Sequence, residues 1–259
     1  MGTSQKLRIR IRMEVLTRHK YLFLLLILII GCSKDDGSGC FTRQGNIVTI
    51  ERILEGNVNT LEIRDNAVVT IKQGPEFKAL VRGGENLLDS YKTRVEGDRL
   101  IIENLTSCDW TRDLGTPFEV TVILPSLRSI YYTGYGALYS DGPFNVDTLL
   151  IDVTQGVGEY NLELYGDKLE LVHHTGATNA TLKGSFDYVY CYSTSQSIFD
   201  MEDLIVNSGF YANGGTGNMT INTSEYIKIQ LNLTGNIFYT QDPEIYIETH
   251  IGSGQLIHY

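Results

Sequence analysis

The chain has 259 residues, 42% of them hydrophobic, and its 21 Lys and Arg against 31 Asp and Glu give a formal net charge of −10. Such an acidic chain is a poor partner for nucleic acid, because binding to phosphates requires clustered cations. The 5 Pro, 26 Gly and 16 Tyr combine turn-forming glycines with strand-favouring aromatics, which predicts an all-β protein.

Residues 1–31 have the pattern of a secretory signal. A cationic stretch precedes the apolar residues 21–30, and this run is about half of the roughly twenty residues that a membrane-spanning helix needs. Gly31 and Cys32 follow, an arrangement that resembles the lipobox of bacterial lipoproteins. We therefore expect cleavage before Cys32 and lipidation of its thiol, which attaches the mature chain to a membrane. An uncleaved helix is the alternative, and Met13 is a second candidate start.

Residues 32–39 are expected to form a flexible acidic linker, since Asp, Gly and Ser bury too little apolar area to fold. The segment Ser33-Lys34-Asp35-Asp36 resembles the signal that sends lipoproteins of the Bacteroidetes to the outer cell surface. This predicts an outer-membrane lipoprotein at the cell surface, with the periplasmic face as the alternative. Residues 1–31 contain six Lys and Arg and one Glu, so the mature chain carries 15 basic and 30 acidic residues, a net charge of −15.

Three cysteines remain after lipidation, in an oxidising compartment where disulfides persist. Cys191 alternates with Val189 in a predicted strand, which favours a small buried side chain. Elimination leaves Cys40 and Cys108 as the candidate disulfide. A zinc site is the rival interpretation, but neither a Cys-x-x-Cys motif nor a nearby His supports it.

Residues 40–126 alternate apolar and polar side chains, as half-buried strands do. The predicted strands are 47–53, 60–63, 67–73, 77–81, 99–103 and 118–124, and residues 86–91 could form one helical turn. Gly74-Pro75 and Gly97-Asp98 have turn chemistry. We expect this β module to pack on, or to be continuous with, residues 127–259.

Residues 127–259 contain corners, most of them rich in glycine, at intervals of 17 to 22 residues. A period near twenty with short strands is typical of a solenoid and predicts a parallel β-helix. The corners lie at 133–136, 156–158, 175–178, 195–197, 215–217, 234–236 and 252–254. Gln196 and Ser197 replace the glycines at one corner, so we expect the coil to be irregular there.

Aligning the strands before each corner gives apolar columns, as the interior of a β-helix requires. One column contains Leu149, Leu169, Val189, Ile227 and Ile245, and a second contains Ile151, Leu171, Cys191, Ile229 and Ile247. The intervening columns are mixed and mostly polar, which places them on the outside.

Several segments together resemble the head GIN domain family of bacterial auto-transporter adhesins. They are residues 66–74, 84–88, 98–102, 124–130, 235–239 and 252–257, with the Gly-x-Gly corners. The resemblance covers about residues 40–259 and implies a right-handed β-helical fold. It brings no catalytic residues, and the corner at Gln196 and Ser197 departs from its pattern.

The outward columns do not form the acidic ladder that a polysaccharide lyase or hydrolase would need. His173 and His174 alternate across a strand and cannot bind one metal together. Thr154, His174 and Thr194 share a predicted outward column, but no acid stands behind the imidazole. We therefore predict no catalytic residue, no metal and no cofactor.

Tyrosines are the better candidates for function, because their amphipathic rings suit glycan or protein surfaces. The candidate binding residues are Tyr131, Tyr132, Tyr135, Tyr139, Tyr190 and Tyr192, together with Trp110, which is either a recognition tip or a plug over the disulfide. The alternative is that these rings cover or fill a β-sheet, which enriches tyrosine in any case.

The sequence thus predicts a lipid-anchored envelope protein that binds a glycan or a protein. A scaffolding protein that assembles through its solenoid is the alternative, a polysaccharide-processing enzyme is less favoured, and the oligomeric state stays open.

Overall fold

The computed structural model describes residues 43–106 and 117–259. The predicted signal and linker, Cys32, Cys40, Cys108 and Trp110 therefore lie outside the described residues. No described segment forms a helix long and apolar enough to cross a membrane. The described chain is all-β, as predicted, and forms one large mixed sheet of 15 strands.

The strands before residue 125 combine antiparallel and parallel pairs. They are β1 (Ile47–Ile53), β2 (Thr60–Ile63), β3 (Val68–Gln73), β4 (Lys78–Gly84), β5 (Tyr91–Glu96), β6 (Arg99–Asn104) and β7 (Phe118–Leu124). The pairs β1–β4, β4–β7 and β5–β6 are antiparallel, whereas β2–β6 and β3–β7 are parallel. Three strands, β1, β2 and β7, have the predicted bounds.

Strand β5 is absent from the prediction. Its outward residues Lys92, Arg94 and Glu96 are all charged, so its apolar alternation is weak. The segment before it is a hydrogen-bonded turn in which Leu87 N donates to Gly84 O and Ser90 N to Leu87 O, both at 2.8 Å. The predicted helical turn at 86–91 is therefore a turn over 85–90 that leads straight into a strand.

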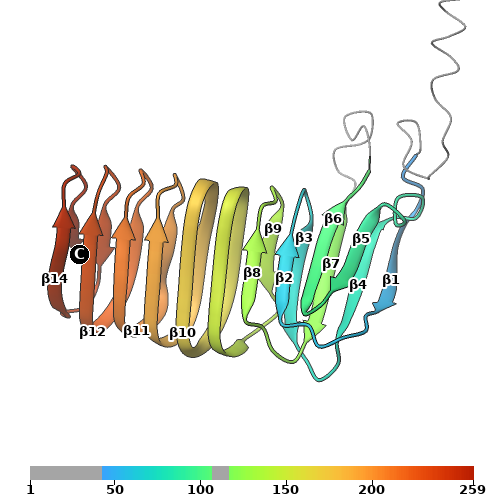
Figure 1. The fold of residues 1–259 in the computed structure, drawn as a ribbon, viewed down its shortest axis with the longest axis horizontal. Coiled ribbons are helices and arrows are strands. Elements are labelled where there is room, and N and C mark those ends of the chain that lie inside the picture. The colour runs from blue at the N-terminus through green and yellow to red at the C-terminus, as the bar shows by residue number, and fades with distance from the viewer. Residues whose placement is uncertain (1–42, 107–116) are drawn as a thin grey trace, which may run out of the picture.

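The strands after residue 125 lie side by side and parallel (Figure 1). They are β8 (Ser129–Tyr132), β9 (Ala137–Ser140), β10 (Phe144–Ser193), β11 (Phe199–Asn213), β12 (Met219–Leu231), β13 (Ile237–Tyr239), β14 (Glu244–His250) and β15 (Leu256–His258). Each segment pairs with one about twenty residues later: Ser129 with Leu150, Tyr188 with Ser208, and Tyr226 with Glu244.

Both parts of the chain belong to the same sheet. Strand β2 pairs in parallel with β8, and β3 pairs in parallel with β9. The sheet is open, with its main path running from β1 to β15. The all-β prediction is confirmed, while the finer prediction of a right-handed parallel β-helix and the proposed division after residue 126 stay predictions.

The predicted corners coincide with bends or breaks between strands, except where β10 runs through them without interruption. The irregular corner at Ser195 to Ser197 keeps the parallel register on both sides, because Ala180 pairs with Phe199 and Tyr192 with Ala212. Serine hydroxyls replace the glycines here by bonding to one another, with Ser193 Oγ and Ser195 Oγ 2.9 Å apart and Ser195 Oγ donating to Ser197 Oγ at 2.8 Å.

The apolar columns form the core. Leu149, Leu169, Val189 and Ile227 in one column, and Ile151, Leu171, Cys191 and Ile229 in the other, have no exposed surface. Cys191 is free and buried, as predicted. The last members differ, since Ile245 is 39% and Ile247 47% exposed. They lie on β14, which pairs within the described residues with β12 and with no strand beyond it.

Candidate functional site

A row of aromatic side chains lies on the outer face of the second half of the sheet. The register aligns Tyr190 with Phe210, Lys228 and Tyr246, and aligns Tyr188 with Ser208, Tyr226 and Glu244. We call this surface the tyrosine face, and its members are Tyr131, Tyr188, Tyr190, Tyr192, Phe210, Tyr226, Lys228 and Tyr246. These side chains are partly or well exposed, reaching 53% for Tyr246.

The rings of the tyrosine face pack on one another along the direction that crosses the strands. Tyr190 and Phe210 stack with ring centroids 5.2 Å apart and an interplanar angle of 27°. The Lys228 ammonium lies 5.4 Å from the Phe210 centroid and 2.6 Å from a carboxylate oxygen of Glu248. Tyr190 and Phe210 therefore cover one another, and the Lys228 ammonium lies over the Phe210 ring as well.

The predicted tyrosines divide among several environments. Tyr131, Tyr190 and Tyr192 lie on the tyrosine face, whereas Tyr139 lies on β9, which pairs with β3 on the other side of the corner. Tyr135 stands at that corner and is 59% exposed. The inclusion of Tyr132 is wrong: its ring is fully buried and its hydroxyl donates to Gly136 O at 2.8 Å, so it cannot contact a ligand.

Sequence reasoning did not identify Phe210, Tyr226 or Tyr246 as candidate binding residues. The register between β11 and β12 shifts at Met201/Ile205 and again at Val206/Ser208. These shifts shorten the step from Phe210 to Lys228, whereas the step from Tyr190 to Phe210 keeps the regular twenty residues. The stronger signal was the twenty-residue spacing of Tyr190 and Phe210.

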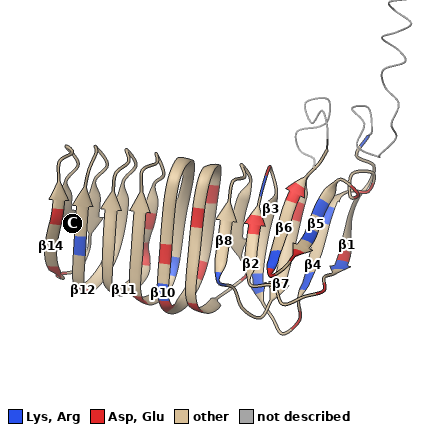
Figure 2. Cartoon of the chain, in the orientation of Figure 1, with Lys and Arg blue, Asp and Glu red and all other residues tan. Residues whose placement is uncertain are grey.

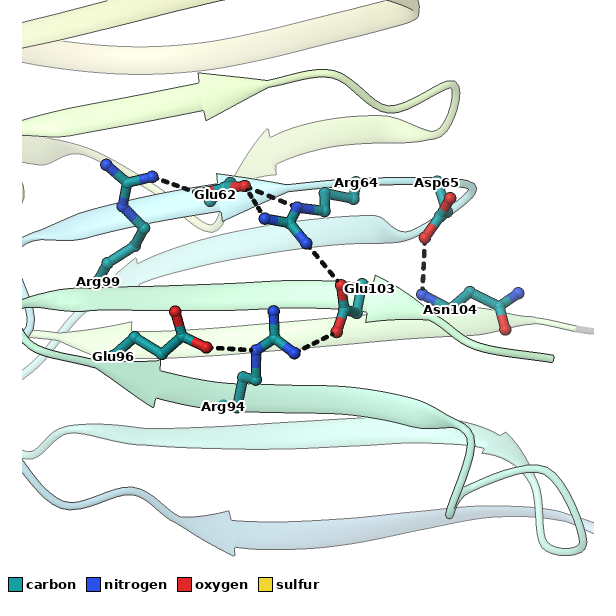
Figure 3. Close-up of polar contacts among 8 residues, drawn as sticks. All are labelled: Glu62, Arg64, Asp65, Arg94, Glu96, Arg99, Glu103 and Asn104. Carbon is teal, nitrogen blue, oxygen red and sulfur yellow. Dashed lines mark hydrogen bonds and ion pairs between the residues drawn. The ribbon is translucent and has the colours of Figure 1, made fainter. Parts of the chain in front are cut away.

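An ion-pair network covers the same outer face in the first half of the sheet (Figures 2 and 3). Glu62 accepts hydrogen bonds from Arg64 Nε at 2.6 Å and from Arg99 Nη1. Glu103 accepts from Arg64 Nη1 at 2.8 Å and pairs with Arg94 Nη1 at 2.9 Å, and Arg94 pairs in turn with Glu96 at 3.0 Å. Three arginines thus neutralise three glutamates.

Burial alone would raise the pKa of the Glu62 carboxyl, since little of it meets water. The hydrogen bonds from Arg99 and Arg64 outweigh that effect and lower its pKa. The network joins the tyrosine face where the Arg99 guanidinium lies 4.8 Å from the Tyr131 ring centroid. Along one continuous sheet, the outer face therefore changes from a network of ion pairs without net charge to a row of aromatic side chains.

Neither His173 nor His174 has both an acid and a hydroxyl nucleophile among its side-chain partners. His173 is fully buried, with Nε2 2.9 Å from the Tyr160 hydroxyl and Nδ1 3.0 Å from Ser197 Oγ, and no carboxylate is among these partners. His174 points outward, and its Nε2 lies 3.4 Å from Asp152 Oδ2, an acid that the sequence reasoning missed. The Thr194 hydroxyl donates to the His174 carbonyl at 2.6 Å and so is not positioned as a nucleophile.

No group of three or more His, Cys, Asp and Glu side chains within 43–106 and 117–259 is placed to hold a metal ion. The Asp200, Glu202 and Asp203 side chains are exposed to solvent. These three residues therefore do not form a preorganised cation-binding site.

Comparison with known proteins identifies the family. The family model "Putative auto-transporter adhesin, head GIN domain" matches residues 57–243. The chain belongs to the head GIN domain family. This confirms the resemblance seen in the sequence, and the family is described as an adhesin, not as an enzyme. No curated protein matches the chain.

Solved structures of similar fold include three from Bacteroides and Parabacteroides. A "putative adhesin" from Bacteroides fragilis is 20% identical with a TM-score of 0.75, covering 83% of this chain and 97% of that one. A "putative lipid binding protein" from Parabacteroides distasonis is 18% identical (TM-score 0.61, 83% and 97% covered). A "putative adhesin" from Parabacteroides merdae is 16% identical (TM-score 0.59, 84% and 98% covered). At these identities the likeness to this head GIN domain protein is one of fold.

Proposed function

We propose that the protein is an adhesin-like binding protein of the bacterial envelope, and that the tyrosine face contacts a protein partner. The observation that carries the proposal is the row formed by Tyr190, Phe210, Lys228 and Tyr246, which points outward from rigidly paired strands. Tyrosine and other aromatic residues are enriched at the centres of protein interfaces. Membership of a family described as an adhesin supports a binding role.

A protein partner fits this face better than a glycan does. Sugars bind aromatic residues through open ring faces, whereas Tyr190 and Phe210 cover one another and cations cover Phe210 and Tyr131. The side chains of this face stay partly exposed and combine apolar ring atoms with tyrosine hydroxyls, which suits the mixed contact of two protein surfaces. Glycan recognition by this face is the alternative.

Replacing Tyr190 or Phe210 by Ala is expected to weaken binding of the partner at least tenfold, since truncating a central aromatic residue typically costs about 2 kcal/mol. The measurement is the affinity of purified protein for arrayed host and bacterial surface proteins and for arrayed glycans. Tyr165→Ala is the matched control, because Tyr165 is also exposed, at 36%, and bonds to Glu163 away from this face. Protein binding that is unchanged by both variants would discard the tyrosine face, and glycan binding that both variants lose would favour the alternative.

We further propose that the stacked parallel segments form a right-handed β-helix, continuous with the β module of residues 40–126. The parallel partners at intervals near twenty residues support this coil. Parallel crossover connections are right-handed in nearly all proteins. A stiff coil of this kind would hold the tyrosine face away from the membrane.

The anchor is proposed at Cys32, with attachment to the outer membrane and display at the cell surface. Support comes from the short apolar run, Gly31 before Cys32, and the acidic linker behind it. Two or more acyl chains give stable attachment, because each buried CH₂ contributes about 0.8 kcal/mol. The periplasmic face of the membrane is the alternative.

Cells that express the protein and are fed an alkyne-tagged fatty acid are expected to label it. Cys32→Ala should abolish the label and move the protein out of the membrane fraction, while Cys40→Ala, a cysteine eight residues away, should keep both. Wild-type protein without label would exclude lipidation. Protease added to intact cells should remove the protein if it is displayed, and protection until lysis would favour the periplasmic face.

Scaffolding is the second candidate function, and one observation favours it. Strand β14 and the residue after it leave apolar side chains uncovered, with Ile245, Ile247 and Ile251 exposed by 39, 47 and 78%. An uncovered sheet end can pair with another chain. A protein that stays monomeric at all concentrations would exclude this function. Processing of polysaccharides is less favoured, because the family is described as an adhesin.

A further inference from the structure

A small hollow lies on the sheet where β9 ends. Strand β9 stops at Ser140, while its neighbour β10 continues, and Ser140 Oγ takes the place of a strand carbonyl by accepting from Glu163 N at 2.8 Å. The hollow left beside this point has a volume of about 280 Å³, and its walls include Tyr139, Asn161, Thr181 and Lys183. Its volume falls just below the roughly 300–1,000 Å³ of sites for drug-sized ligands, so only a smaller ligand fits.

Two polar side chains in the hollow have no partner within the described part of the chain: the Asn161 amide and the Thr181 hydroxyl. Other outward asparagines hold the strands together instead. The oxygen of Asn179 accepts from Ile198 N at 3.0 Å, and that of Asn218 accepts from Asn236 N at 2.9 Å. Asn161 lies on the same sheet but makes no such link between strands. The two N–H donors and the oxygen acceptor of its amide are therefore available to a ligand.

An aromatic ring stands beside these free groups. Tyr139 pairs in register with Asn161, and its hydroxyl donates to Glu159 Oε1 at 2.7 Å, which fixes the ring. On the far side, Lys183 pairs with Glu163 at 3.1 Å. The ion pair leaves this wall without net charge, so an anionic ligand gains little there.

We propose that this hollow binds one neutral sugar residue. The apolar face of the sugar would pack on the Tyr139 ring, while vicinal hydroxyls would bond to the Asn161 amide and the Thr181 hydroxyl. An aromatic ring with a few convergent polar groups is the composition of a small polar-ligand site. The site lies on β9 and β10 away from the tyrosine face, so it is a second function and does not depend on a protein partner.

The test is saturation-transfer NMR on the full chain in detergent, with the methyl glycosides of glucose, galactose, mannose, fucose, N-acetylglucosamine and N-acetylgalactosamine, each at millimolar concentration. At least one sugar should give a signal, and Tyr139→Ala and Asn161→Ala should each reduce it at least fivefold. Tyr139→Phe keeps the ring and should keep the signal. Thr181→Val should weaken the signal, whereas its matched control Thr49→Val, which changes an exposed Thr on β1, should leave it unchanged.

Two results would overturn the proposal. The first is no saturation transfer from folded wild-type protein to any of the six sugars. The second is a signal that survives unchanged in Tyr139→Ala and Asn161→Ala. Because Tyr190 and Phe210 lie elsewhere, their Ala variants should retain sugar binding. The failure of the sugar site can therefore be distinguished from the failure of the tyrosine face.

Discussion

Replacing Gly176 by Ala is expected to lower the free energy of unfolding by roughly 3–5 kcal/mol, enough to unfold many domains. Gly176 has a φ of +110° inside β10, and an added Cβ would collide with the carbonyl oxygen of Gly156 in the neighbouring segment. The backbone conformation disfavours any L side chain. The collision adds a second cost, because both atoms belong to strands fixed by the sheet. Urea unfolding followed by circular dichroism measures the loss.

Gly142→Ala is the matched control for this prediction. Gly142 also has a positive φ, +82°, but an added Cβ there would meet nothing within 4 Å. Its replacement should therefore cost only the conformational strain, about 1–2 kcal/mol. Equal losses for the two variants would contradict the claim that close packing of neighbouring segments, and not φ alone, requires glycine at the corners.

The sequence was sufficient to predict the core of the second half. Leu149, Leu169 and Val189 recur every twenty residues, Ile227 follows after Gly209 in the same column, and all four apolar side chains are buried. Burial of one apolar column against the next is a strong constraint, since a shift by one residue would expose the whole set. The exposure of Ile245 could not be predicted from its column, because it depends on whether another strand follows.

The candidate site was less predictable than the core. Tyr132 alternates with buried Ile130, which indicates that it faces the core. Its neighbour Tyr131 has the same side chain, however, so the residue types alone do not show which of the two faces inward. Phe210 follows Tyr190 by twenty residues and was therefore predictable, but its neighbour Gly209 interrupts the apolar column between Val189 and Ile227 and obscures the strand. The contact of His174 with Asp152 joins strand segments whose side-chain rotamers the sequence does not specify.

The protein is also expected to lose stability in mild acid because of His173. Burial, with a smaller contribution from neighbouring His174, lowers the pKa of the His173 imidazole from 6.5 to about 3. The unfolded chain therefore binds a proton below pH 6.5 that the folded chain does not. Stability falls as the pH drops from 6.5 towards 3, and the loss between pH 7 and pH 4 is about 3 kcal/mol from this group.

A variant pair separates this effect from the titration of carboxylates. His173→Phe combined with Tyr160→Phe removes both the imidazole and the hydroxyl that bonds to it. The Tyr160 hydroxyl is therefore not left buried without its partner. The double variant should lose about 3 kcal/mol less than wild type between pH 7 and pH 4, as measured by urea unfolding at each pH. His174→Gln changes the exposed neighbour and should retain the wild-type loss.

Parallel loss of stability in the wild type and the double variant would show that the His173 imidazole accepts a proton without leaving its buried position. That outcome requires water or an acid near the ring, whereas its partners in the fold are the hydroxyls of Tyr160 and Ser197. A hydroxyl can accept a hydrogen bond from a protonated imidazole, but it cannot neutralise the buried charge. The buried polar chain from Tyr160 through His173 to Ser197 is therefore stable in the core only while the imidazole is neutral.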